Sequence, residues 1–149
     1  MVSIDLVLAP TDCSEESARA IDYAIAVADR YGAALHLLHV VDERIVQGME
    51  KGDVAAEDVA SQYQDFAAEV EAQAAATPGI DGFSYSSAAG FSVSTLSRTP
   101  GSVVLDAADE LEADFIVIPR ETPSGEPAET LGKAALYVLE YASQPVLSV

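Results

Sequence analysis

The chain has 149 residues, half of them apolar, and 25 Asp and Glu residues against 7 Lys and Arg give it a formal net charge of −18. This length is typical of one domain with its own core, so we expect a single domain over residues 1–149. The apolar content argues against disorder, and the apolar runs fall short of the ~20 residues of a membrane span. The acidic excess argues against nucleic acid and membranes as partners, because nucleic acid and anionic lipid bind basic surfaces.

The N-terminal residues contain no basic stretch followed by an apolar one, so a cytoplasmic location is expected. A single cysteine, Cys13, fits a reducing compartment. The acidic residues are scattered rather than grouped in blocks, which is typical of a folded surface. We interpret this acidic protein as halophilic, because molar salt screens charges within ~3 Å. An ordinary acidic protein is the alternative.

The chain begins with a strand pattern and a helix pattern. Residues 4–9 (IDLVLA) are rich in branched side chains and predict a strand that the run Pro10, Thr11 and Asp12 ends. Asp12 or Ser14 can cap the following helix, whose apolar residues recur at helical spacing and whose end is marked by Gly32.

Residues 35–41 (LHLLHVV) predict the second strand. Two glycines, Gly48 and Gly52, predict a loop over residues 43–52. Apolar residues then repeat at 4-3-4-4 spacing and predict a long helix; they are Val59, Tyr63, Phe66, Val70 and Ala74.

The segment of residues 79–91 is rich in Gly and Ser, and it predicts a loop or a short extra strand near residues 83–86. Residues 93–97 alternate and predict a strand. Thr99 followed by Pro100 is typical of a helix start, so a third helix is expected there.

Residues 115–118 (FIVI) are continuously apolar, which is typical of a strand buried on both faces. A loop with three prolines follows over residues 119–127. A fourth helix is predicted from the spacing of Leu131, Ala135, Val138 and Ala142, and a last strand runs from Pro145 to Val149.

Alternating strands and helices with apolar strands predict an α/β fold, a parallel sheet with helices on both faces. In such sheets a ligand lies outside the carboxyl ends of the strands. Here those ends correspond to residues 10–14, 41–44, 97–100 and 119–133.

Two parts of the sequence resemble the universal stress protein (UspA-like) family. They are residues 6–42 (LVLAPTDCSEESARAIDYAIAVADRYGAALHLLHVVD) and the last third, from TPGSVVLDAADELEADFIVIPR at residues 99–120 to LGKAALYVLEYASQPVLSV at residues 131–149. The resemblance implies a three-layer Rossmann-like (adenine nucleotide alpha hydrolase-like) fold with a five-stranded parallel sheet of order 3-2-1-4-5. It also implies a homodimer joined through the last strand and, for one branch of the family, ATP binding.

The ATP-binding branch carries a glycine pattern after the fourth strand, and this chain departs from it. Pro119 and Thr122 occupy the first two glycine positions, Gly132 keeps the third, and Lys133 replaces the hydroxyl residue. The usual glycine before the third helix is Arg98. Glycines let backbone N–H groups approach phosphate, whereas proline has no N–H to donate. The pattern therefore indicates a degenerate nucleotide site.

The charges in this loop also argue against binding of a triphosphate. Glu121, Glu126 and Glu129 face a triphosphate with only Arg120 and Lys133 to balance them. Each pair of like charges ~4 Å apart costs ~4 kcal/mol at an effective dielectric constant of ~20. A bound divalent cation would reverse this sign.

The resemblance maps a vestigial nucleotide site onto Pro10, Thr11, Asp12, Val41, Gly132 and Lys133. Each has a plainer interpretation as well. Asp12 also suits a helix cap or turn, and Val41 suits a buried core strand. Lys133 also suits a pair with Glu129 four residues back, which is worth a few tenths of a kcal/mol.

Catalytic and metal chemistry find little support in the sequence. Cys13 lies at the start of a helix, but Asp12 and Glu15 oppose its thiolate. His36 and His39 are three apart on a strand and so point to opposite faces, which excludes a shared metal; we expect one packed and one exposed. No G-x-S-x-G, H-E-x-x-H or Walker lysine is present, so no catalytic residue is assigned.

The sequence thus indicates a homodimeric, cytoplasmic universal stress protein that acts as a binding and regulatory module of the stress response. Its partner would be a protein or a small ligand other than ATP, with no cofactor or metal and no nucleic acid or membrane. The alternative is an ATP- or AMP-binding protein with a modified phosphate loop. A third hypothesis, an enzyme that cleaves or transfers phosphate, needs donors that Pro119, Glu121 and Thr122 supply poorly.

The halophile hypothesis predicts that the melting temperature rises between low salt and ~1 M KCl, because screening relieves the repulsion among the acids. Thermal unfolding followed by circular dichroism at a series of salt concentrations measures this. A melting temperature that stays flat or falls would favour an ordinary acidic protein.

Overall fold

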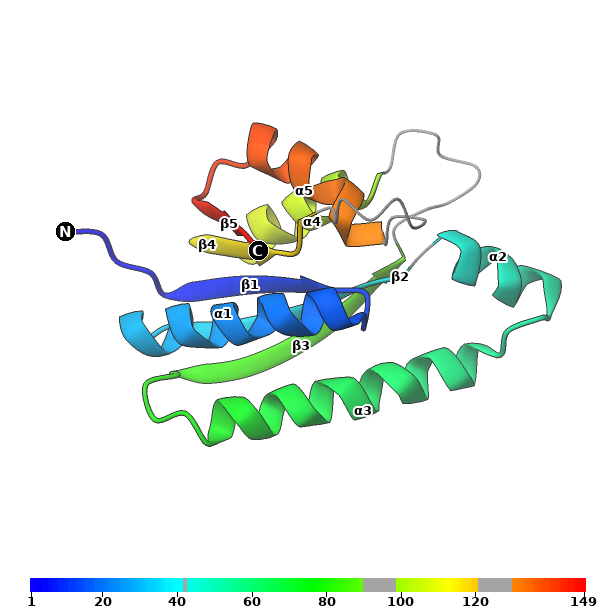
Figure 1. Cartoon of the computed structure of the whole chain (residues 1–149), viewed down its shortest axis with the longest axis horizontal. Helices are drawn as coiled ribbons and strands as arrows, with labels where there is room; N and C mark the ends of the chain where they lie inside the picture. The colour runs from blue at the N-terminus through cyan, green and yellow to red at the C-terminus, as the bar shows by residue number, and fades with distance from the viewer. Residues whose placement is uncertain (42, 90–98, 121–129) are drawn as a thin grey trace.

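The computed structural model describes residues 1–41, 43–89, 99–120 and 130–149. These residues form a five-stranded parallel sheet of order β3-β2-β1-β4-β5 (Figure 1). The strands are β1 (Leu6–Thr11), β2 (Ala34–Val41), β3 (Gly82–Ala89), β4 (Phe115–Ile118) and β5 (Val146–Ser148). The helices are α1 (Glu15–Tyr31), α2 (Glu43–Lys51), α3 (Ala56–Ala75), α4 (Pro100–Glu110) and α5 (Thr130–Tyr141). The predicted fold class and strand order are confirmed.

Helices cover both faces of the sheet, with α1 and α3 on one side and α4 and α5 on the other (Figure 1). Alternation along β2 divides its side chains between two cores. Leu35 and Leu37 pack in the α1 and α3 core, whereas Leu38 and Val40 pack in the α4 and α5 core. A strand buried on both faces has to be apolar throughout, which explains the sequence of β2.

Helix starts and ends lie where the sequence predicts them. Ser14 is the N-cap of α1 and accepts a hydrogen bond from the N–H of Ser17, and Gly32 ends the helix with a φ of +66°. Thr99 caps α4 and forms a reciprocal capping box with Ser102. The Ser14 cap fixes the point at which the chain turns from β1 into α1, and the Thr99 cap fixes the start of α4.

The loop predicted over residues 43–52 is wrong, because residues 43–51 form α2. The two glycines have other roles than a loop. A Cβ on Gly48 would lie 2.8 Å from a methyl carbon of Val54, so glycine lets the chain after α2 fold back closely. Gly52 has a φ of +79° and ends the helix.

The third strand of the sheet is β3, which confirms the extra-strand alternative and extends it to residues 82–89. It pairs with β2 along eight residues, from Ala34 opposite Gly82 to Val41 opposite Ala89. The strand predicted over residues 93–97 lies outside the described residues. The strand predicted over residues 4–9 continues beyond Ala9 to Thr11, so it ends within the stop predicted from Pro10, Thr11 and Asp12.

Pro10 is tolerated inside β1 because of the way the neighbouring strands end. The ladder between β1 and β4 joins Val7 and Leu8 only, so at Pro10 the strand pairs with β2 alone. A proline is accepted where one side of the strand needs no N–H donor. Among the described helices, none is long and apolar enough to cross a membrane.

Candidate functional site

The turn after β1 holds three of the predicted site residues, Pro10, Thr11 and Asp12. Thr11 is fully buried, and its hydroxyl lies 2.8 Å from that of Ser17. The same Thr11 oxygen accepts the backbone N–H of Cys13 at 2.9 Å. The hydroxyl of Thr11 is therefore engaged in fixing the turn.

Asp12 also bonds within the turn, where its carboxylate accepts the N–H of Ser14 at 3.1 Å. Ser14 in turn accepts the N–H of Ser17 at 3.1 Å. The helix cap is thus Ser14, and Asp12 forms the turn before it, which is one of the two structural roles that aspartate favours there.

Val41 lies at the end of β2, beyond the turn after β1, and the other two predicted residues belong to α5. Thr11 pairs with His39, so Val41 lies two residues beyond this pair on β2, and it is 8% exposed. Gly132 and Lys133 lie in the first turn of α5. The contact predicted between Lys133 and Glu129, and the position of Arg98, lie outside the described residues. We refer to Pro10, Thr11, Asp12 and Val41 below as the strand-end residues.

The chain directly after β4 offers little to a phosphate. Pro119 is buried and has no N–H. The N–H of the next residue, Arg120, donates to the carbonyl of Val149 at 2.9 Å, next to β5. Two successive positions where the glycine pattern begins therefore supply no free backbone donor.

Cys13 adopts a left-handed conformation with a φ of +64°. Burial, and then the carboxylate of Asp12, raise the pKa of its thiol to about 11. Both effects disfavour the charged thiolate and outweigh any help from the helix terminus. The side chain is therefore a neutral thiol near pH 7 and a poor nucleophile.

His36 and His39 point to opposite faces of β2, but the prediction that one is exposed is wrong, because each is 5% exposed. The ring of His36 bonds the hydroxyls of Ser84 and Ser86 at 2.7 and 2.8 Å. His39 stacks on Tyr63 of α3, with ring centroids 4.3 Å apart. Both are covered because helices lie on both faces of the sheet. Burial lowers the pKa of each ring, and for His39 the carboxylate of Asp12 opposes this shift.

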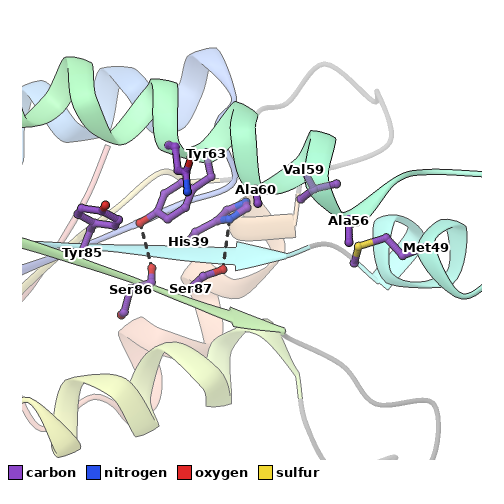
Figure 2. A pocket seen from close by; sticks show the side chains of 10 residues that line it. His39, Met49, Ala56, Val59, Ala60, Tyr63, Tyr85, Ser86 and Ser87 are labelled. Carbon is purple, nitrogen blue, oxygen red and sulfur yellow. Dashed lines mark hydrogen bonds between the residues drawn. The ribbon is translucent and has the colours of Figure 1, made fainter.

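A cavity of about 370 Å³ opens beside His39, between α3 and the carboxyl halves of β2 and β3 (Figure 2). Figure 2 shows His39 and Tyr63 side by side beneath α3, with Met49 of α2 next to Ala56 at the other end. We call this cavity the α3 pocket. Its lining residues are His39, Met49, Ala56, Val59, Ala60, Tyr63, Gln64, Tyr85, Ser86 and Ser87.

Sequence reasoning missed the α3 pocket, although it identified Val59 and Tyr63 as members of one helix face. The pocket is bounded by α2 at one end and by β3 below. The sequence predicted a loop in place of α2, and for β3 it allowed either a loop or a short strand. A signal was present in the spacing of Ile45, Val46 and Met49, which suits one face of a short helix.

The fold and the arrangement of strand ends define a Rossmann-like α/β protein, the class in which ligands lie at the carboxyl ends of parallel strands. The sequence profile of the universal stress protein family matches residues 4–149. The chain therefore belongs to the universal stress protein family.

Solved structures with the same fold are similar over nearly the whole chain. Universal stress protein UspA from Lactobacillus plantarum has a TM-score of 0.74 at 19% identity, over 100% of this chain and 99% of its own. A universal stress protein in complex with cAMP has a TM-score of 0.66 at 23% identity, over 99% and 98%. The universal stress protein from Archaeoglobus fulgidus in complex with dAMP has a TM-score of 0.63 at 19% identity, over 99% and 98%. No curated protein matches the chain.

We predict that Cys13 resists alkylation. At pH 8 a thiol with a pKa of about 11 has ~100-fold less thiolate than one at the ordinary 9.0, so iodoacetamide should react at least ~100-fold more slowly with the folded protein. Mass spectrometry of the protein between pH 7 and 9.5 measures the rate. The urea-unfolded chain is the control and should react at the ordinary rate, and Asp12→Asn should speed the folded reaction. Equal rates for the folded and unfolded chains would contradict the assigned pKa.

Proposed function

We propose that this universal stress protein acts as a binding and regulatory module of the stress response and does not bind ATP. The observation that supports this is the chain after β4, where Pro119 has no N–H and Arg120 donates its N–H to Val149. Backbone N–H groups are the usual cradle for phosphate in sheets of this kind. A triphosphate would find neither donor available.

The hydrogen bonds of the strand-end residues support the same proposal. Thr11 and Asp12 use their side-chain oxygens within the turn, on Ser17, Cys13 and Ser14. A ligand that recruits them has to break these bonds, at roughly 1 kcal/mol each. The surplus of Glu over basic residues in the segment of residues 119–133 adds repulsion toward any anion.

The alternative is a nucleotide monophosphate as ligand. Two relatives of the same fold are described in complex with cAMP and with dAMP, which carry fewer charges than ATP. A monophosphate needs fewer backbone donors, so the loss at Pro119 matters less for it. This alternative keeps the strand-end residues as the nucleotide site and assigns Gly132 and Lys133 to the phosphate side.

An enzymatic role has little to support it. Among the described residues, no group of three or more His, Cys, Asp or Glu side chains is arranged to hold a metal ion. Cys13 is a neutral thiol with a raised pKa. We therefore propose that the protein works through binding. A cytoplasmic location and a high-salt interior are part of the same proposal, and the net charge of −18 supports the high-salt interior.

Isothermal titration calorimetry with ATP and Mg²⁺ tests the proposal. We expect no binding tighter than about 100 µM, which corresponds to at most ~5.5 kcal/mol of binding free energy. Parallel titrations with AMP and cAMP test the alternative, and the relative solved with cAMP is the positive control for cAMP. ATP binding below about 100 µM would overturn the proposal, whereas binding of AMP or cAMP alone would favour the alternative.

We also propose that the protein is a homodimer joined through its last strand. β5 pairs with β4 on one edge, through Pro145 and Val149, so by alternation the backbone groups of Val146 and Ser148 point away from the sheet. An unpaired strand edge favours pairing with a second copy about a twofold axis. Leu136 and Leu139, both exposed on the neighbouring helix α5, add apolar surface.

Light scattering at micromolar concentration should therefore give twice the 15.6 kDa chain mass. Ser148→Pro removes the outward N–H and should give a monomer, while Ser148→Ala keeps that N–H and should remain a dimer. A monomer mass for the unchanged chain would remove this proposal. A dimer that persists in Ser148→Pro would place the interface elsewhere.

A further inference from the structure

The beginning of α3, before the buried Tyr63, is not covered as the rest of its apolar stripe is, although its sequence pattern is that of a packed helix. In the second half of the helix, Ala67, Val70 and Ala74 are buried. One and two turns before Tyr63, Val59 is only half-buried and Ala56 is exposed, although both line the pocket. The apolar stripe of α3 thus continues over the α3 pocket, whose volume is in the range of small-molecule sites.

One wall of the α3 pocket is aromatic and held rigid. The hydroxyl of Tyr63 donates to the carbonyls of Leu37 and Ser86, at 3.2 and 2.9 Å, which fixes the ring beside His39. The ring of Tyr85 stands nearly perpendicular to that of Tyr63, at an interplanar angle of 80° and a centroid distance of 5.9 Å. Tyr85 is 49% exposed, so part of its ring surface is open to a ligand.

The polar groups of the pocket are few and neutral. The hydroxyl of Ser87 lies 3.4 Å from Nδ1 of His39, a distance at the limit of a hydrogen bond. A ligand can therefore replace this weak bond with a hydrogen bond of its own to Ser87. Gln64 adds an amide that both donates and accepts. The hydroxyl and the amide together suit a ligand with one donor and one acceptor.

The composition of the pocket argues against charged ligands. None of the ten lining residues is Asp, Glu, Lys or Arg, in a chain of which 21% of the residues are charged. Burial lowers the pKa of His39, so its ring is neutral near pH 7. Among the lining residues that the structure describes, none offers a counter-charge to an ion, and the net charge of −18 on the protein repels an anion.

We infer that the α3 pocket binds a neutral, planar heteroaromatic molecule of one or two fused rings, with its face against the aromatic wall and its polar atoms toward Ser87 and Gln64. The pocket residues do not include Pro10, Thr11, Asp12 or Val41. The inference therefore stands whether or not a nucleotide binds at the strand ends.

Benzimidazole is a suitable probe, because it is planar, neutral at pH 7.5 and carries one donor and one acceptor. We expect a dissociation constant on the order of 1 mM or tighter, a usual range for ligands of this size. Tyrosine fluorescence and ¹⁵N-resolved NMR shifts measure it, with the largest shifts expected at Tyr85, Ser87 and Gln64. Benzoate, which is planar but anionic, and cyclohexanol, which is neutral but not planar, should bind at least about tenfold more weakly.

A matched pair of variants locates the binding. Ala60→Phe places a ring in the pocket and should weaken benzimidazole binding at least about tenfold, whereas Ala68→Phe makes the same change at an exposed position of α3 outside the pocket and should leave it unchanged. Equal melting temperatures for the two variants show that both fold. Tyr85→Ala should also weaken binding.

Two results would overturn the inference. One is the absence of benzimidazole binding at concentrations up to about 10 mM, which is about tenfold above the expected dissociation constant of about 1 mM. The other is equal binding by Ala60→Phe and Ala68→Phe. A titration of ATP into protein saturated with benzimidazole separates this question from the proposed function. Independent binding of the two ligands would leave the pocket intact even if ATP binding contradicted the proposal for the strand-end residues.

Discussion

The parallel register of β1 against β2 is the constraint on which both candidate sites depend. Thr11 lies opposite His39, so the turn after β1 stands next to a buried histidine ring. That ring stacks on Tyr63, which links the turn to α3. The carboxylate of Asp12 acts on the pKa of His39, and Cys13 acts on that of Tyr63, so the groups are close enough to influence each other. A slip of one residue would turn His39 to the other face of the sheet and separate the two sites.

Hydrogen bonds within the chain occupy most of the polar groups described at the strand ends. The oxygens of Thr11 and Asp12 accept hydrogen bonds from the N–H groups of Cys13 and Ser14 in the half-buried turn, so they already have partners. At the end of β4, the N–H of Arg120 extends the pairing toward the last strand by bonding Val149. These bonds stabilise the edge of the sheet where a phosphate would otherwise bind. Structural stability and phosphate binding therefore compete for the same donors in this chain.

The parts of the fold that local chemistry dictates were predictable from the sequence. Ser14, Gly32 and Thr99 act within a few residues of their own positions, so their patterns fix helix ends without knowledge of the rest. The continuous apolar run of β4 likewise required burial on both faces. The family resemblance supplied the strand order, which local patterns alone do not determine.

The errors occurred where a residue acts through a distant neighbour. Gly48 stands inside α2 because a side chain there would meet Val54, which folds back against it, whereas in the sequence alone a glycine favours a loop. His36 is buried because serines of β3 meet it across a register that the sequence does not reveal. The α3 pocket depends on both effects together, since it needs α2 as a wall and β3 as a floor.

The net charge of the protein affects ligand binding at the strand ends but has little effect on binding in the α3 pocket. An anion at the strand ends meets the field of the whole protein, which salt screens over a distance of ~3 Å at ~1 M and ~10 Å at 0.1 M. A neutral ring in the α3 pocket meets no such field, because its binding comes from apolar burial and ring contacts. Rising salt therefore relieves the barrier at the strand ends and strengthens apolar burial only slightly. In a high-salt cell the electrostatic argument against nucleotides weakens, and the argument that remains is geometric: Pro119 has no N–H, and the N–H of Arg120 is already bonded.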